Sequence, residues 1–425
     1  MRILLLSQFY PPIVGGEERH VRNLAAALAE RGNQVAVATL WYPGAEKFER
    51  DGAVTVYRLR GTLQRLSWLF AESERRHAPP FPDPELVLGL RRVIANEQPD
   101  VVHAHNWLVA SFLPIKRHYR LPLVVTMHDY GLTCPKKNLV RNGALCTGPG
   151  LAKCLSCTAS HYGLVKGAVT MIGNMASGAW LRRTADMFIT VSRAVAQHTG
   201  LARSRLPFEV IHNFVPNDVG EAKVSADHPQ PDLPDGNYIL FVGDVTQPKG
   251  IGVLLKAYES LNGAPPLVLI GRWCSDAPQQ LPPNVRLLAP RPHAAVMQAW
   301  RRCLFGVVPS TGPEPCATVV MEAMACGKAV IGTDIGGTPD LVDDGATGLV
   351  VPPGDSEALA NAMKLLLARP DLCADLGAAG LARVEMLKAR SIVPQIESVY
   401  EHVIRTNTQL VAPARWATFV SGRRR

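Results

Sequence analysis

The apolar residues near the N-terminus follow two different patterns, continuous runs and a helical spacing. Arg2–Ser7 and Gln34–Leu40 are short, nearly continuous apolar runs, as expected of buried strands. Between them, the apolar residues of Glu18–Arg31 recur with helical spacing, and Gly32 is suited to end that helix. A strand, a helix and a strand in this order predict a βαβ unit within a parallel, covered sheet.

The same alternation of strand-like and helix-like segments continues along the chain. Further strands are predicted in two series: Val101–Ala104, Leu123–Met127, Met187–Val191 and Glu209–His212, then Tyr238–Val242, Leu267–Ile270, Val285–Leu288, Phe305–Val308, Ala329–Gly332 and Gly348–Val351. Between the two series, Asp, Pro, Gly and Asn dominate and the apolar period fades, which is typical of a linker. The sequence therefore predicts an α/β fold with two doubly wound domains.

Length and composition agree with this division and narrow the choice of partners. The chain has 425 residues, enough for two domains, and 47% of them are apolar. Its formal net charge of +9 suits phosphate-rich ligands, anionic lipid surfaces or nucleic acid. No basic run is interleaved with aromatic residues, so nucleic acid is not expected as a partner.

The N-terminal residues do not have the pattern of a secretory signal. Only the four apolar residues Ile3–Leu6 precede Ser7, whereas a signal peptide needs about seven or more. No run of about eighteen apolar residues occurs, so no membrane span is expected. We therefore expect a cytoplasmic protein, in which a disulfide framework is not favoured.

Cysteine and histidine residues mark two further candidate sites in the first half. One insertion contains Cys134, Cys146, Cys154 and Cys157. Four thiolates can close a tetrahedral zinc site, so a structural zinc is one interpretation and four reduced thiols are the other. His103 and His105 end a predicted strand, where they either touch an acceptor molecule or cap the strand end.

Two glutamates stand close together in the segment Pro309–Gly327. Glu314 lies in a predicted loop after a strand, and Glu322 lies on the helix that follows. A helix that starts beyond the carboxyl end of a strand is where α/β sheets bind ligands, and its free N–H groups favour phosphate. Glu314 would accept hydrogen bonds from sugar hydroxyls and Glu322 from a ribose diol. Two solvated carboxylates beside a helix are the alternative interpretation.

Two more loops of the second half follow predicted strands. Gly243–Gly250 places Lys249 at the start of a helix, where its ammonium can meet a phosphate; a solvated loop lysine is the alternative. Gly332–Pro339 contains the pair Gly336 and Gly337, which allows a ligand to approach the backbone closely. Since loops at the carboxyl ends of parallel strands meet at one edge, these segments predict one crevice.

In this order, the segments resemble the retaining family-4 glycosyltransferases of GT-B fold over about residues 1–400. The matching text is VGGEERHV at Val14–Val21, HDY at His128–Tyr130, FVGDVTQPKG at Phe241–Gly250, VPS at Val308–Ser310, the two glutamates with EAMACG, the Gly336–Gly337 pair and TGLVVPPGD at Thr347–Asp355. The resemblance implies two Rossmann-like domains facing across a cleft. The acceptor-side domain would span 1–215 and the donor-binding domain 236–390. Three further segments would complete the chain. They are a linker at 216–235, a helix at about 391–405 that packs back on the first domain, and a basic tail at 406–425.

The resemblance also implies residue roles. Lys249 would stabilise the leaving diphosphate, Glu314 would bind the donor sugar, and Glu322 would bind the ribose. Gly15 and Gly16 would face the diphosphate and the acceptor across the cleft. Catalysis is thus assigned to His128, Lys249 and Glu314, and donor binding to Gly15, Gly16, Lys249, Glu314, Glu322, Gly336 and Gly337.

The implied activity is retaining transfer of a sugar from a nucleotide-sugar donor to a glycan, lipid-linked or small-molecule acceptor. It would serve cell-surface polysaccharide or glycoconjugate synthesis, without a catalytic metal and with peripheral contact with the inner membrane surface. A nucleotide-sugar-binding protein with weak or no transferase activity is one alternative. Another GT-B enzyme, such as a nucleotide-sugar epimerase or a phosphorylase, is a second. An NAD-binding protein is disfavoured because no GxGxxG follows a strand.

One position departs from the family pattern. Asp244 stands where the family usually has an arginine, and a carboxylate beside a diphosphate is unfavourable. Asp244 must therefore point away or pair with a cation, and Arg272 and Arg291 are the candidates that could replace the missing charge. Asp340 also replaces a common glutamate, which is a milder change.

Overall fold

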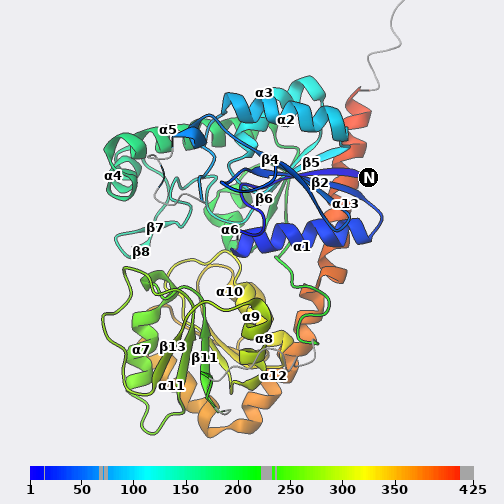
Figure 1. Ribbon diagram of the computed structural model, residues 1–425. Coiled ribbons are helices and arrows are strands. Elements are labelled where there is room, and N and C mark those ends of the chain that lie inside the picture. The colour runs from blue at the N-terminus through cyan, green and yellow to red at the C-terminus, as the bar shows by residue number, and fades with distance from the viewer. Residues whose placement is uncertain (14, 67–69, 71–74, 222–231, 235–236, 412–425) are drawn as a thin grey trace, which may run out of the picture.

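The computed structural model describes residues 1–411 apart from 14, 67–69, 71–74, 222–231 and 235–236. It contains two α/β halves, each built on its own sheet, and they lie one above the other in Figure 1. Trp68 and the terminal arginines Arg423–Arg425 of the basic tail fall outside the described residues. Of the helices that are described, none is both long and apolar enough to cross a bilayer.

The first half is an eight-stranded sheet in the order β10-β9-β6-β5-β1-β2-β4-β3. All neighbours pair in parallel except β3, which runs antiparallel to β4. Its strands are β1 (Arg2–Leu6), β2 (Gln34–Leu40), β3 (Phe48–Asp51), β4 (Val54–Leu59), β5 (Val101–Ala104), β6 (Leu123–Met127), β9 (Met187–Thr190) and β10 (Phe208–Val210). The central strands are buried along their length, as their mostly apolar sequences predict.

Helices cover both faces of this sheet. They are α1 (Gly16–Glu30), α2 (Pro84–Glu97), α3 (Val109–Tyr119), α4 (Leu151–Tyr162), α5 (Leu164–Thr184) and α6 (Arg193–His198). The last helix of the chain, α13 (Ala389–Val411), joins α1 on one face, where Ile396 and Tyr400 pack in the same core as Leu24. Figure 1 shows α13 running up from the lower half along the side of the upper one.

The second half is a six-stranded parallel sheet in the order β13-β12-β11-β14-β15-β16. Its strands are β11 (Ile239–Val242), β12 (Leu267–Ile270), β13 (Val285–Leu288), β14 (Gly306–Val308), β15 (Val330–Thr333) and β16 (Leu349–Val351). Its helices are α7 (Ile251–Glu259), α8 (His293–Arg302), α9 (Thr318–Ala325), α10 (Thr338–Leu341), α11 (Ser356–Ala368) and α12 (Pro370–Val384). The order places β11, β14 and β15 side by side, so the loops after them meet.

The chain crosses between the halves at two places, and the two crossings are bonded to each other. The backbone N–H of Val215 donates to the carbonyl of Leu387 at 3.1 Å, and that of Ala389 donates to the carbonyl of Val215 at 2.9 Å. Val215 and Lys388 form a parallel bridge. The segment that leaves the first half and the segment that returns to it are therefore held together.

The cysteine-containing insertion is more regular than its sequence suggested. It comprises the small hairpin β7 (Val140–Arg141) and β8 (Ala144–Leu145), followed by α4. The next helix, α5, packs against α4 and α3. In Figure 1 the two helices project from one end of the upper half.

Candidate active site

Three loops of the second half meet at the carboxyl ends of neighbouring strands. After β11, a short 3₁₀ turn (Gln247–Lys249) leads into Gly250, whose positive φ of 77° favours glycine. A side chain at Gly250 would collide with the carbonyl of Pro309 in the loop after β14. The backbone N–H of Thr311 donates to the carbonyl of Pro248 at 3.0 Å, which joins the same two loops.

Lys249 and Glu314, predicted from separate motifs, form an ion pair between Nζ and Oε1. The Ser310 hydroxyl donates to the other carboxylate oxygen of Glu314 at 2.9 Å. Burial raises the pKa of Glu314, but the Lys249 ammonium and the two hydrogen bonds outweigh it, so the net pKa is lowered. Glu314 is therefore held as a carboxylate beside a cation.

The glycine pair after β15 packs directly on the Glu314 loop. The backbone N–H of Gly337 donates to the carbonyl of Glu314 at 2.7 Å. Gly336 has a φ of 63°, and a side chain there would collide with the Glu314 carbonyl. A side chain at Gly337 would collide with the carbonyl of Pro315. The two glycines thus allow the loops to approach closely and fix the backbone that presents Glu314.

Glu322 faces the first half of the molecule. It lies in α9, is only 4% exposed, and accepts hydrogen bonds from His293 Nε2 at 2.9 Å and Arg19 Nη1 at 3.2 Å. Arg19 belongs to the first turn of α1, which Gly15 caps and Gly16 begins. Gly16, Arg19 and Glu322 line one small cavity of about 20 Å³. The predicted glycine loop and the predicted ribose ligand therefore lie across the cleft from each other.

His128 follows β6 and belongs to a cluster of four imidazoles. Its Nε2 is 2.9 Å from Nδ1 of His105, and its ring is 4.9 Å from that of His20. His103 lies 4.1 Å from the ring of His105. Burial and the neighbouring His103 lower the pKa of His128 to about 3, so this ring is neutral near pH 7.

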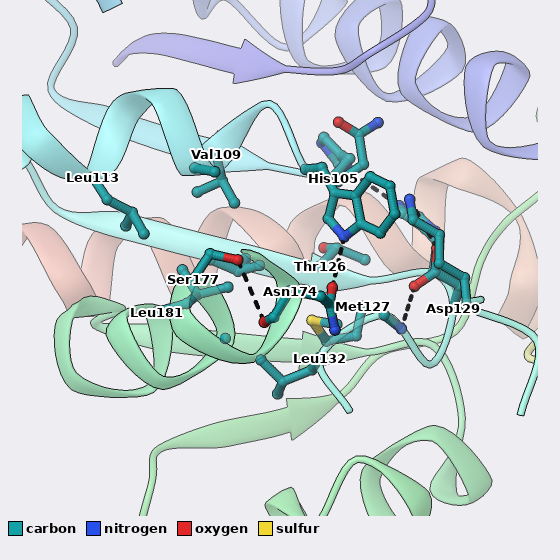
Figure 2. Close-up of a pocket in the computed structure, with 18 residues that line it drawn as sticks. His105, Val109, Leu113, Thr126, Met127, Asp129, Leu132, Asn174, Ser177 and Leu181 are labelled. Atoms are coloured by element: carbon teal, nitrogen blue, oxygen red, sulfur yellow. Dashed lines mark hydrogen bonds and ion pairs between the residues drawn. The ribbon is translucent and has the colours of Figure 1, made fainter. Parts of the chain in front are cut away.

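The His128 loop also reaches the Glu314 side of the cleft. Burial, and then the charge of Glu314, raise the pKa of Tyr130, two residues after His128. His128 lines a cavity of about 40 Å³ between α3, β6 and α5, which Figure 2 shows. The indole N–H of Trp107 donates to Asn174 across this cavity at 3.0 Å. This cavity of the first half has mostly apolar walls and a few polar groups.

Glu17 is a buried carboxylic acid of the first half that the sequence patterns did not single out. Its carboxylate accepts a hydrogen bond from the side chain of Asn106. Burial raises its pKa to about 8, against the opposing charge of Lys137. The only sequence signal was its position directly after Gly16, in a helix whose first turn favours carboxylates. Arg19 and His293, the partners of Glu322, gave no separate signal.

The departure at Asp244 is resolved by a bidentate ion pair. Arg272 donates through Nε to Oδ1 at 3.0 Å and through Nη2 to Oδ2 at 2.7 Å. Arg291, the other candidate, instead pairs with Asp232 at 2.6 Å. The hydrogen bonds from Arg272 lower the pKa of Asp244 despite partial burial. Asp244 is therefore a paired carboxylate.

Besides the Arg19–Glu322 pair, an ion pair between Arg193 and Asp340 joins the two halves. Asp340, in the first turn of α10, accepts hydrogen bonds from the backbone N–H and the Nε of Arg193 at 2.7 and 2.6 Å. Arg193 begins α6 in the first half. The sequence identified Asp340 only as a replacement for a glutamate and gave no signal for its partner.

The four cysteines predicted to bind zinc do not form a recognisable metal site in the described residues. Within the described residues, which include all four cysteines of the insertion, no group of three or more His, Cys, Asp or Glu side chains is arranged to hold a metal ion. The thiols have other surroundings: Cys134 and Cys146 pack against the apolar core, and Cys154 accepts a hydrogen bond from the Gly150 backbone at 3.4 Å. Cys134 and Cys146 are partly buried against the core, and Cys154 and Cys157 lie on α4, so this arrangement lends the structural zinc no support and it stays a prediction.

Two family models match this chain, one in each half. The model described as Glycosyltransferase Family 4 matches residues 14–219, and the model described as Glycosyl transferases group 1 matches residues 224–383. Among curated proteins, the glycogen synthase of Mycobacterium tuberculosis strain H37Rv is 27% identical, with 87% of each chain covered. The alpha-maltose-1-phosphate synthase of Mycolicibacterium smegmatis is 28% identical over 95% of this chain and 100% of its own.

Solved structures show the same fold. The sucrose-phosphate synthase of Thermosynechococcus elongatus matches with a TM-score of 0.71 and 23% identity, covering 95% of this chain and 99% of that one. HepE of Anabaena in complex with UDP-glucose matches with a TM-score of 0.67 and 19% identity, covering 94% and 99%. At these identities the likeness concerns the arrangement of the two halves.

Proposed function

Because this chain belongs to the group 1 glycosyltransferases of GT-B fold, we propose that it is a retaining, metal-independent enzyme that transfers a sugar from a nucleotide-sugar donor. The observation that carries this proposal is the Lys249–Glu314 pair. It lies where the loops after β11, β14 and β15 meet, and Gly336 and Gly337 fix the backbone that presents Glu314. The acceptor is a glycan, a lipid-linked sugar or a small molecule. We place the enzyme in cell-surface polysaccharide or glycoconjugate synthesis, in the cytoplasm and in peripheral contact with the inner membrane surface.

The donor would lie with its diphosphate between Lys249 and the start of α9. The N-cap residue of α9, Ala317, makes no side-chain cap hydrogen bond, so the first backbone N–H groups of the helix can donate to phosphate. On donor binding, Glu322 would give up its hydrogen bond from Arg19 or His293 and accept hydrogen bonds from the ribose hydroxyls instead. Glu314 would accept hydrogen bonds from the sugar, while Lys249 turns from the carboxylate to the diphosphate.

The chemistry then depends on charge stabilisation and positioning. Negative charge grows on the diphosphate as the glycosidic bond breaks, and Lys249 with the α9 N–H groups is aimed at it. In a retaining transfer on one face, the leaving diphosphate accepts the proton of the acceptor hydroxyl. Neutral His128 would offer a hydrogen bond to the sugar, and the Gly15–Gly16 loop would leave room for the acceptor.

A thermal-shift screen with nucleotide sugars tests the donor site. A donor at 100 times its dissociation constant is expected to stabilise the protein by about 2.7 kcal/mol and to raise its Tm. The Glu322→Gln variant should lose most of that shift, because it removes the charge and replaces one of the two acceptor oxygens by an N–H₂ donor. Glu357→Gln, at an exposed position of α11, is the matched control and should keep it. A shift equal in wild type and Glu322→Gln would contradict the proposed ribose contact.

The Asp244–Arg272 pair keeps one alternative open, namely a protein that binds a nucleotide sugar but transfers poorly. Under the proposal, Asp244→Arg should lower kcat/KM for the donor by several-fold, because it breaks the pair and places two guanidinium groups together. Asp371→Arg breaks the comparably exposed Arg369–Asp371 pair at α12 and is expected to have no effect. A gain of activity in Asp244→Arg would show that the site lacks a cation and would favour the alternative.

A further inference from the structure

Helices α4 and α5 expose an apolar surface that the donor site does not use. Half of the large hydrophobic side chains that are exposed in the described part of the chain lie on these two helices: Leu151, Leu155, Leu164, Val165, Val169, Ile172, Met175 and Trp180. Val165 is 77% exposed and Ile172 is 62% exposed. Single exposed apolar residues need no explanation, but a group of them on adjoining helices marks an interaction surface.

The buried side of α5 is built mostly from small and polar residues, with Met171 and Leu181 as its large apolar members. A side chain at Gly167 would lie 2.6 Å from the Thr158 carbonyl group of α4, and one at Gly173 would lie 2.8 Å from the ring of Phe81. Asn174, on the same side, accepts the hydrogen bond from Trp107 and lines the cavity of Figure 2. These residues let α5 pack closely on its neighbours.

The exposed side of α5 is correspondingly apolar. Val165, Val169 and Ile172 are four and three residues apart, so they share one face of the helix, and Ala176 continues it. Most of the large apolar residues of this helix therefore face outward, contrary to the usual arrangement in which they are buried. Its exposed face is suited to an apolar environment, and the opposite face is already occupied by protein.

The charges of this region have one sign. Between Asp129 and Asp186 the chain has no acidic residue, but it has seven basic ones: Lys136, Lys137, Arg141, Lys153, Lys166, Arg182 and Arg183. A second copy of the chain docked on this face would bring like charges together, which opposes association. A bilayer surface matches both features, because its phosphate head groups can pair with the cations and its acyl layer can take up the aliphatic face of Val165, Val169 and Ile172.

We propose that the α4–α5 face binds a bilayer surface that contains anionic phospholipid, with α5 parallel to the membrane plane. The aliphatic residues would enter the boundary between head groups and acyl chains, while the lysine and arginine heads reach the phosphates. The cavity of Figure 2 lies against the inner side of the same helix. The inference extends the proposed function by naming the surface for its membrane contact, but lipid binding is measured without donor or acceptor, so the two proposals fail separately.

Vesicle sedimentation with the full chain tests this surface. Wild type should bind vesicles of equal parts phosphatidylglycerol and phosphatidylcholine, bind pure phosphatidylcholine less, and release as salt rises. The triple variant Val165→Ser, Val169→Ser, Ile172→Ser should partition at least about tenfold more weakly, because it removes the aliphatic face. Lys153→Glu with Arg183→Glu should weaken binding only to the anionic vesicles.

A matched control removes exposed apolar residues elsewhere. The triple variant Leu365→Ser, Leu381→Ser, Met386→Ser changes three exposed positions of the second half and should bind vesicles as wild type does. Donor thermal shift in both triple variants verifies folding and the donor site independently. Equal vesicle binding by wild type and the α5 variant, or none by wild type, would overturn the inference. A dimer that the α5 variant abolishes would assign the face to a second copy instead.

Discussion

Replacement of Lys249 by alanine is expected to lower kcat by about 10²-fold or more, with a smaller change in donor affinity. The ammonium is the cation placed beside Glu314 at the end of β11, and the charge that it stabilises is largest in the transition state. Steady-state kinetics with the donor identified by thermal shift would separate kcat from KM.

The control for this prediction lies on the neighbouring helix. Lys256 of α7 is exposed, so Lys256→Ala should leave both constants unchanged. Lys249→Ala also leaves the Glu314 carboxylate without its cation, and a second variant that adds Glu314→Gln removes that buried charge. The double variant measures how much the unpaired carboxylate costs in stability, and a Lys249→Ala protein that unfolds as wild type does but turns over slowly has lost activity for a chemical reason. Unchanged turnover and unchanged donor affinity in Lys249→Ala would rule out the proposed donor site.

Acidification from pH 7 to pH 5 is expected to cost about 2 kcal/mol of unfolding free energy through His103 alone. His103 is 1% exposed, and burial followed by the neighbouring His20 lowers its pKa to about 3. In the unfolded chain the imidazole has a pKa near 6.5 and takes up its proton first as the pH falls. The unfolded state therefore binds more protons between about pH 6.5 and pH 3, and stability is lost across that window.

The remaining members of the histidine cluster act in the same direction. Burial lowers the pKa of His20 and of His105, as it does that of His128. Denaturant unfolding at pH 7.5 and pH 5 measures the effect. His103→Gln should reduce the difference between the two pH values, even though it also loses bonds to Tyr400 and Thr126 at both. The control His118→Gln, at an exposed position of α3, should leave the difference between the two pH values unchanged. An undiminished pH dependence of stability in His103→Gln would contradict the assignment to His103.

The strands and donor loops were predictable because their residues are constrained locally. Strands such as β5 and β6 are buried along their whole length, so they appear in the sequence as apolar runs that only His103 and Thr126 interrupt. Lys249 and Glu314 could be placed together since each follows a strand, and adjacent parallel strands end at the same edge. The Asp244–Arg272 pair was one of two pairings left open, and only the fold distinguishes them.

Other features depend on contacts between distant segments. Helix α5 was not predicted, because its buried side carries glycines and Asn174 while its aliphatic residues face outward. Arg19 could not be assigned to Glu322, since that contact joins residues from different halves. The cysteine spacing permitted a metal site, but the described residues show no group of three or more side chains arranged for one. Spacing along the chain cannot show how an insertion folds.

The return of α13 to the first half has a consequence for the order in which the protein is made. Ile396 and Tyr400 complete the core on one face of a sheet whose first strand is β1, so that domain contains residues from both ends of the described chain. A ribosome must synthesise the whole second half before this helix becomes available. The second half, contiguous from β11 to α12, can therefore finish folding while the first still exposes an uncovered apolar face to chaperones.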